Sequence, residues 1–123
     1  MVTIYGIKNC DTMKKAFKYL DEKGIAYTFH DYRVDGIDEV LIDQFLAQFP
    51  LKELVNKRST TYRNLSDEEK ATIDEVAVVK AIMLREPTLI KRPVLLKTAG
   101  DSGENQKGLV GFKAADYDAF FAR

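Results

Sequence analysis

A single cysteine, Cys10, is the residue best suited to covalent chemistry in this chain of 123 residues. It lies between a short apolar stretch, residues 2–5, and an amphipathic stretch, residues 13–20, so we expect it where a strand turns into a helix. The first N–H groups of a helix are unpaired and favour negative charge. Because the thiolate is the nucleophilic form of cysteine, this position predicts a reactive thiol.

The residues around Cys10 are lysines and polar turn or cap residues: Lys8, Asn9, Asp11, Thr12, Lys14 and Lys15. The three lysines add positive potential near the thiol, whereas the carboxylate of Asp11 opposes it. A lone cysteine is most often a small buried hydrophobe without a chemical role. Here the polar neighbours favour the partial exposure that a reactive thiol requires. A single cysteine cannot form an internal disulfide, which favours a reducing compartment.

Other candidate sites are weak. His30 is the only histidine, and we interpret it as a structural residue of a strand rather than a catalytic base. One histidine and one cysteine are too few for a zinc site, which usually takes about four ligands, so we expect no bound metal. We find neither a glycine-rich phosphate loop nor a stripe of basic and aromatic residues, so we expect no direct nucleic-acid binding.

Charge and length set broad limits. The 19 basic and 19 acidic side chains balance, and no block of like charge suggests a membrane-binding patch. No apolar segment approaches the roughly 20 residues of a membrane helix, and the N-terminus lacks the pattern of a secretory signal. The length suffices for a sound core without disulfides or metals. We therefore expect one cytoplasmic domain, residues 1–123, without membrane association.

The two ends of the chain predict strands and helices in a defined order. A strand over residues 2–5, a helix ending at Gly24 and a strand over residues 27–32 follow one another with short links, which implies a right-handed crossover and a parallel pair. Later, residues 93–97 and 108–112 predict two antiparallel strands joined by a hydrophilic connection over residues 98–107. A final helix presents Tyr117, Phe120 and Phe121.

The middle of the chain predicts a helical insert over approximately residues 37–87. Apolar residues at helical spacing predict a helix that ends at Pro50 and a short helix after it. Residues 56–64 are polar and rich in threonine, and we interpret them as a loop. Ser66 and Glu69 have the spacing of a capping box, which predicts a helix that continues with interruption to about Arg85.

This order, β-α-β, a helical insert, then β-β-α, is the topology of thioredoxin with its middle helix expanded. It predicts an α/β fold with a four-stranded mixed sheet and Cys10 at the end of the first strand. It also predicts a cis peptide bond between Arg92 and Pro93, because such folds keep one at the start of the third strand, whereas only about 5–6% of X–Pro bonds are cis in general.

Three segments resemble the arsenate reductase (ArsC)-like family: Ile-Tyr-Gly-Ile-Lys-Asn-Cys-Asp-Thr at residues 4–12, Asn-Lys-Arg-Ser-Thr-Thr-Tyr at 56–62, and Ile-Lys-Arg-Pro at 90–93. Within the family the chain is most similar to the YffB branch, which is related to the Spx regulators. The resemblance covers nearly the whole chain. The arsenate reductases of this family use one nucleophilic cysteine with three arginines around the oxyanion, and take electrons from glutathione and glutaredoxin.

The resemblance implies catalytic roles for Cys10 and Arg92, and it maps the first of the three arginines near Arg58. The third arginine is absent, because the chain reads Gly-Phe-Lys at residues 111–113. Lysine lacks the planar two-point grip of a guanidinium, so arsenate capture should weaken by about 1.5–3 kcal/mol. The residues that we assign to substrate binding are Lys8, Asn9, Thr12 and Pro93.

We therefore expect a glutathione-dependent thiol reductase or transferase. The Cys10 thiolate attacks a disulfide or a glutathionylated substrate, and free glutathione, a co-substrate rather than a bound cofactor, resolves the mixed disulfide. Glutaredoxin is a further candidate partner, and we expect a monomer. One alternative is a true glutathione- and glutaredoxin-dependent arsenate reductase. The other is an Spx-like regulator that binds RNA polymerase, although Met13 replaces the second cysteine of the Spx Cys-x-x-Cys switch.

Overall fold

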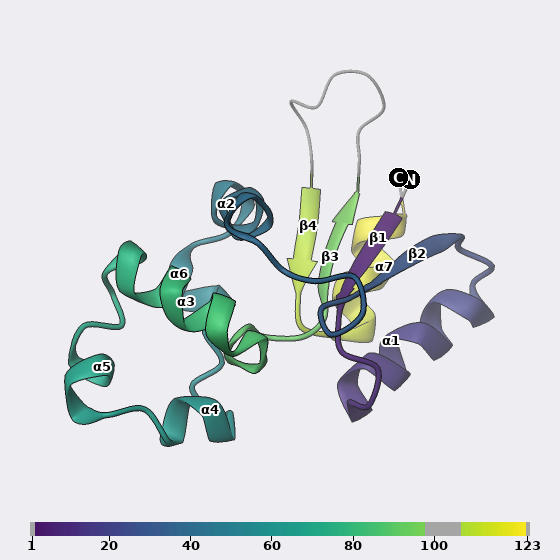
Figure 1. Ribbon diagram of the computed structural model, residues 1–123. Helices are drawn as coiled ribbons and strands as arrows, with labels where there is room; N and C mark the ends of the chain where they lie inside the picture. The colour runs from purple at the N-terminus through teal and green to yellow at the C-terminus, as the bar shows by residue number, and fades with distance from the viewer. Residues whose placement is uncertain (1, 98–106, 123) are drawn as a thin grey trace. The chain divides into compact units, whose positions relative to one another are not determined.

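The computed structural model describes residues 2–97 and 107–122, which form two compact units (Figure 1). The first unit combines Met1–Gly36 with Arg92–Arg123, and the second is Ile37–Lys91. The second unit contains the predicted helical insert and extends to Lys91. That the two units make a single domain stays a prediction.

The first unit is a four-stranded mixed sheet with two helices. Its elements are β1 (Val2–Gly6), α1 (Asp11–Glu22), β2 (Tyr27–Asp31), β3 (Val94–Lys97), β4 (Lys107–Val110) and α7 (Ala114–Phe121). The strand order is β2-β1-β3-β4, with β1 parallel to β2 and antiparallel to β3, and with β3 antiparallel to β4. The predicted sheet is confirmed. The predicted connection over residues 98–107 lies, apart from its last residue, outside the described residues.

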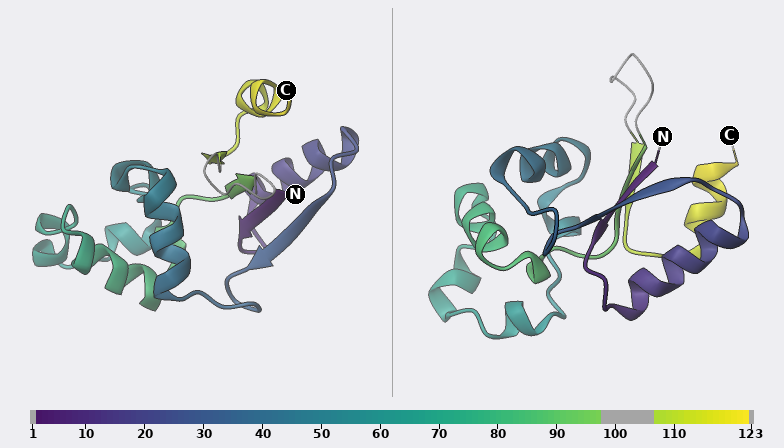
Figure 2. Two further views of the ribbon diagram at one scale, coloured as in Figure 1. Left: turned by 90° about the horizontal axis from the view of Figure 1, so that it is seen from above. Right: turned by 45° about the vertical axis from the view of Figure 1, so that its right-hand side comes forward.

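Helices α1 and α7 pack on the same face of the sheet (Figure 2). The apolar stripe of α1 buries Met13, Ala16 and Leu20 completely, which is the side chain pattern of an amphipathic helix against a core. The Tyr19 hydroxyl of α1 donates a hydrogen bond to Asp118 of α7. These contacts fix the start of α1 relative to the sheet. The buried cluster consists of Val2, Ile4, Met13, Ala16, Leu20, Leu95 and Tyr117.

Helix α1 ends at a glycine in the left-handed conformation. Gly24 has φ 67°, its N–H donates to the Asp21 carbonyl oxygen at 3.2 Å, and the Ile25 N–H donates to that of Leu20 at 2.9 Å. This pair of bonds is a Schellman motif, in which the residue after the helix must adopt positive φ. The predicted helix end at Gly24 is confirmed.

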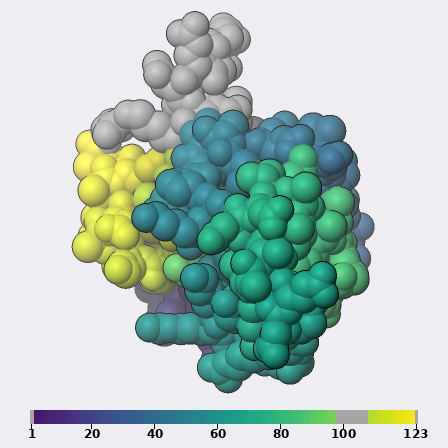
Figure 3. Space-filling view, turned by 90° about the vertical axis from the view of Figure 1, so that its left-hand side faces the viewer, coloured from purple at the N-terminus to yellow at the C-terminus, as the bar shows by residue number. Residues whose placement is uncertain are grey.

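The second unit contains short helices and one 3-10 turn. They are α2 (Glu39–Gln48), α3 (Leu51–Leu54), α4 (Thr60–Arg63), α5 (Asp67–Ala71), α6 (Val76–Arg85) and η1 (Pro87–Leu89). Figure 3 shows one face of this unit in teal and green. The capping box at Ser66 is confirmed, because its Oγ accepts the Glu69 N–H at 3.0 Å and Glu69 Oε1 accepts the Ser66 N–H at 3.2 Å. Within residues 2–97 and 107–122, no helix has the length and apolar character needed to span a membrane.

The prediction of a loop throughout residues 56–64 is wrong. Thr60–Arg63 form a helical turn, α4, because Ser59 acts as its N-cap. The Ser59 Oγ accepts the Tyr62 N–H at 3.1 Å and donates to the Asn56 carbonyl oxygen at 2.7 Å. Serine is a preferred N-cap residue, and here this local hydrogen bond outweighs the low helix propensity of the two threonines that follow.

The Gly24 turn gives a direct test of the fold. A Cβ at this position meets nothing within 4 Å, so any cost of substitution comes from backbone strain alone. We expect Gly24→Ala to lower the free energy of unfolding by about 1 kcal/mol. Gly24→Asn, the matched control, should cost less because asparagine tolerates positive φ. Urea denaturation measures both, and an alanine variant as stable as the parent would contradict the left-handed helix end.

Candidate active site

Cys10 stands at the N-cap of α1. Its backbone is extended, with φ −141° and ψ 128°, and its carbonyl oxygen accepts the Lys14 N–H at 3.0 Å as the first bond of the helix. The side chain is half-buried and packs against the apolar cluster under α1. The thiol is thus partly shielded by the core and partly open to a reactant, as the sequence predicted from its polar neighbours.

Opposing influences act on the Cys10 thiol. Burial is the largest single one, and it raises the pKa. The backbone N–H groups of Met13 and Thr12, a hydrogen bond from the Arg92 side chain and the positive charge of Arg92 all lower it. Together these four outweigh burial, and the pKa of Cys10 lies below its usual value. Hydrogen bonds from these N–H groups stabilise the charged form of the thiol, as expected at the start of a helix.

Arg92 reaches Cys10 because of the pairing between β1 and β3. The two strands are antiparallel with Tyr5 opposite Val94, so residues just before Val94 lie beside the residues that follow β1. The predicted cis peptide bond between Arg92 and Pro93 is confirmed. Pro93 is buried, and its carbonyl oxygen accepts the Gly111 N–H at 2.8 Å. A guanidinium from late in the chain thus stands at the helix start that carries the thiol.

Tyr32 is a neighbour of Arg92 that is not among the residues predicted from the sequence. Its side chain is buried, and burial together with the nearby Tyr5 raises the pKa of its hydroxyl well above the usual value, whereas the Arg92 charge lowers it. Its N–H donates to the Gly6 carbonyl oxygen at 2.9 Å, which ties it to the end of β1. The only signal in the sequence is its position at the end of the expected strand over residues 27–32, which is expected to pair in parallel with the first strand.

The predicted substrate-binding residues lie in different environments. Lys8 and Asn9 are exposed in the turn between β1 and α1, Thr12 is half-buried and directs its N–H toward the thiol, and Pro93 is buried beside Arg92. The structure thus brings Thr12 and Arg92 together at Cys10. A role in substrate binding stays a prediction for all four.

Arg58 belongs to the second unit, whereas Cys10 and Arg92 belong to the first. Its side chain is exposed, and its backbone N–H donates to Asn56 Oδ1 at 3.1 Å in the turn that leads into α4. The participation of Arg58 in catalysis stays a prediction.

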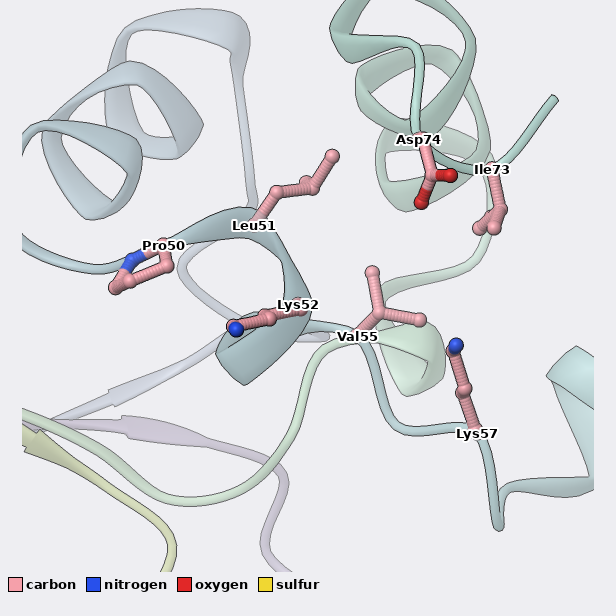
Figure 4. A pocket seen from close by; sticks show the side chains of 7 residues that line it. All are labelled: Pro50, Leu51, Lys52, Val55, Lys57, Ile73 and Asp74. Carbon is pink, nitrogen blue, oxygen red and sulfur yellow. The ribbon is translucent and has the colours of Figure 1, made fainter.

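A cavity of about 290 Å³ lies in the second unit (Figure 4). Leu51, Val55 and Ile73 form apolar walls, and Lys57 and Asp74 direct their charged ends toward the same space. No thiol, hydroxyl or imidazole lines it. Across the part of the chain that the structure describes, no cluster of side chains could hold a metal ion. Cys10, the only cysteine of the chain, remains the candidate nucleophile.

Comparison with known proteins decides the family. The model of the ArsC family matches residues 5–120. The chain belongs to the ArsC family. An uncharacterized protein from Haemophilus influenzae is 46% identical to this ArsC-family chain over 122 residues, covering 99% of this chain and 100% of that protein. The global transcriptional regulator Spx of Staphylococcus aureus is 26% identical, covering 100% of this chain and 88% of Spx.

Two solved structures are similar to this ArsC-family protein along nearly its whole length. A protein named YffB has 43% sequence identity and a TM-score of 0.83, with 97% of each chain covered. An arsenate reductase (ArsC) related protein from Brucella melitensis has 45% identity and a TM-score of 0.74, with 99% of this chain and 95% of that chain covered. The resemblance to the ArsC family and the thioredoxin-like fold are both confirmed.

The influence of Arg92 on the thiol can be measured directly. Arg92→Met removes both its hydrogen bond and its charge while Cys10 stays half-buried, so the pKa of Cys10 should rise. Arg92→Lys keeps a charge without the planar fork and should raise it less. The rate of iodoacetamide alkylation of the folded protein, measured as a function of pH, has its midpoint at the pKa of Cys10.

Lys113→Met is the matched control for this measurement. Lys113 is exposed at the N-cap of α7, and it is not among the groups that shift the pKa of Cys10. Its substitution should leave the alkylation midpoint unchanged. A midpoint equally unmoved in Arg92→Met would mean that the guanidinium does not act on the thiol.

Proposed function

We propose that this protein is a glutathione-dependent thiol reductase or transferase in which Cys10 is the nucleophile. The observation that carries the proposal is the Cys10 thiol itself, half-buried at the start of α1 with a pKa lowered by Arg92 and two backbone N–H groups. A lowered pKa increases the fraction of thiolate at neutral pH, and thiolate is the form that attacks a disulfide.

The proposed reaction has two thiol–disulfide exchange steps. In the first, the Cys10 thiolate attacks the glutathione sulfur of a glutathionylated substrate; the Cys10–glutathione disulfide forms, and the substrate leaves as a thiolate that takes up a proton. In the second, a glutathione thiolate attacks the glutathione sulfur of this mixed disulfide. Glutathione disulfide forms, and Cys10 returns as the thiolate. In sum, one glutathionylated substrate and one glutathione thiol give one substrate thiol and one glutathione disulfide.

Arg92 has two tasks in this scheme. It stabilises the Cys10 thiolate before attack and again when Cys10 leaves in the second step, since a lower pKa makes a better leaving group. Its guanidinium can also pair with a carboxylate of glutathione. We assign Lys8, Asn9, Thr12 and Pro93 to binding of the glutathione moiety, and Arg58 to a further anion contact.

The resolving thiol must come from outside the chain, because Cys10 is the only cysteine. The position three residues later holds Met13, which is completely buried. This arrangement excludes a Cys-x-x-Cys disulfide switch. We therefore infer that glutathione, with glutaredoxin as a further candidate, supplies the second thiol, and that a monomer works in the reducing cytoplasm.

Arsenate reduction is the second candidate function, and family membership favours it. Cys10 and Arg92 suit it, but the position expected for a third arginine holds Lys113. A lysine is a point charge that cannot bind two oxyanion oxygens in a planar fork. A glutathione carboxylate carries less charge than arsenate and needs fewer arginine contacts. Thiol transfer is therefore the first candidate.

A coupled assay tests the proposal. The purified protein is given glutathionylated 2-mercaptoethanol, glutathione, glutathione reductase and NADPH, and the oxidation of NADPH follows the formation of glutathione disulfide. We expect turnover above the uncatalysed exchange, loss of this excess in Cys10→Ser, and a glutathione adduct on Cys10 by mass spectrometry when glutathione is limiting. Wild-type turnover at the uncatalysed rate would refute thiol transfer.

The same preparation separates the alternatives. Arsenate-dependent NADPH oxidation with glutathione and glutaredoxin, lost in Cys10→Ser, would establish arsenate reduction instead. Copurification with RNA polymerase, retained in Cys10→Ser, would establish an Spx-like regulator that does not depend on the thiol.

A further inference from the structure

Hydrogen bonds to and from Asp31 define the turn that follows β2, residues 33–36. The N–H groups of Val34 and Asp35 donate to the Asp31 carbonyl oxygen at 3.0 and 2.7 Å, and the Arg33 N–H donates to Asp31 Oδ1 at 2.9 Å. The Asp31 N–H donates to Asp35 Oδ2, also at 2.9 Å. Both carboxylates of the turn therefore face its own backbone.

This turn presents one cation and one apolar side chain to solvent. Val34 is 80% exposed, more than any other large apolar side chain in residues 2–97 and 107–122. Arg33 is exposed and takes part in none of the ion pairs between described residues. Because hydrogen bonds already define the turn, binding of a partner to these side chains does not require a loop to become ordered, which would cost entropy.

The turn lies at the same edge of the sheet as the Cys10 thiol. Strands β1 and β2 are parallel with Gly6 opposite Asp31, so both carboxyl ends face one edge, about 4.8 Å apart. In Figure 1 the chain leaves β2 at the end where β1 leads into α1. Arg92 lies near both the thiol and the start of the turn. Its charge acts on the Cys10 thiol and on the hydroxyl of Tyr32, the residue directly before the turn.

We propose that Arg33 and Val34 form a recognition site for the polypeptide of a glutathionylated protein substrate. The inference rests on the thiol-transfer function proposed above and names its substrate class. A polypeptide whose modified cysteine reaches Cys10 passes this edge of the sheet. It can bury Val34 against an apolar side chain and pair Arg33 with an acidic one. Glutathione has carboxylates for Arg33 but no apolar side chain for Val34, so the two residues together fit a protein.

The test compares two substrates in the coupled assay. One is a glutathionylated peptide with a glutamate and a leucine next to the modified cysteine, and the other is glutathionylated 2-mercaptoethanol. We expect Val34→Ser and Arg33→Ser each to lower kcat/KM for the peptide about five- to tenfold and to change that for the small disulfide less than about twofold. The loss caused by Arg33→Ser should shrink at high salt.

Matched control variants come from the second unit. Val40→Ser makes the same substitution at a valine that is 65% exposed, and Arg63→Ser removes an exposed arginine. Both should behave as wild type on both substrates. The hydrogen bonds of the turn use backbone atoms of Arg33 and Val34, so the serine variants keep them.

The outcomes separate the recognition site from the underlying function. If wild type turns over both substrates and the turn variants follow the controls, or lose activity equally on both substrates, the recognition site is refuted and thiol transfer stands. If wild type turns over neither substrate, thiol transfer is refuted and the recognition site falls with it. Loss confined to the peptide supports the site.

Discussion

The chemistry proposed for this protein depends on the interaction between the Cys10 thiol and the Arg92 guanidinium. The two residues are far apart in sequence, and only the antiparallel pairing of β1 with β3 brings Arg92 to the start of α1. The position of α1 is fixed in turn by its apolar stripe against the sheet and by its contacts with α7. The packing of the core thus positions the N-terminus of α1 and the Arg92 guanidinium beside the same sulfur atom.

The half-buried position of Cys10 is a compromise between two requirements. Burial alone opposes the thiolate, and it is the largest single influence on the pKa of the thiol. A fully exposed thiol would escape this penalty but would also lose the low-dielectric surroundings in which the charge of Arg92 and the N–H groups of Thr12 and Met13 are effective. The balance of these influences lowers the pKa of the thiol and leaves the sulfur partly open to a disulfide.

Much of the fold could be predicted from local patterns, whereas part of the site could not. Apolar periodicity and Gly24 defined α1, and strand alternation with short links defined the sheet. The turn α4 was missed because composition suggested a loop, whereas a single hydroxyl, that of Ser59, decides the local structure. The cis bond before Pro93 followed from the fold assignment and not from the residues themselves, since most X–Pro bonds are trans.

Tyr32 shows why the remaining site residues escape sequence reasoning. The expected strand over residues 27–32 includes it, but its neighbours are Tyr5 of β1 and Arg92 just before β3, and their proximity depends on register. The same pairing of β1 with β2 places the turn with Val34 at the edge of the sheet that carries Cys10. In the proposed thiol transfer, a chain with a single cysteine obtains its second thiol from another molecule. Specificity would then come from side chains around the sulfur rather than from an internal disulfide, and the hydrogen-bonded turn at that edge is well placed to provide it.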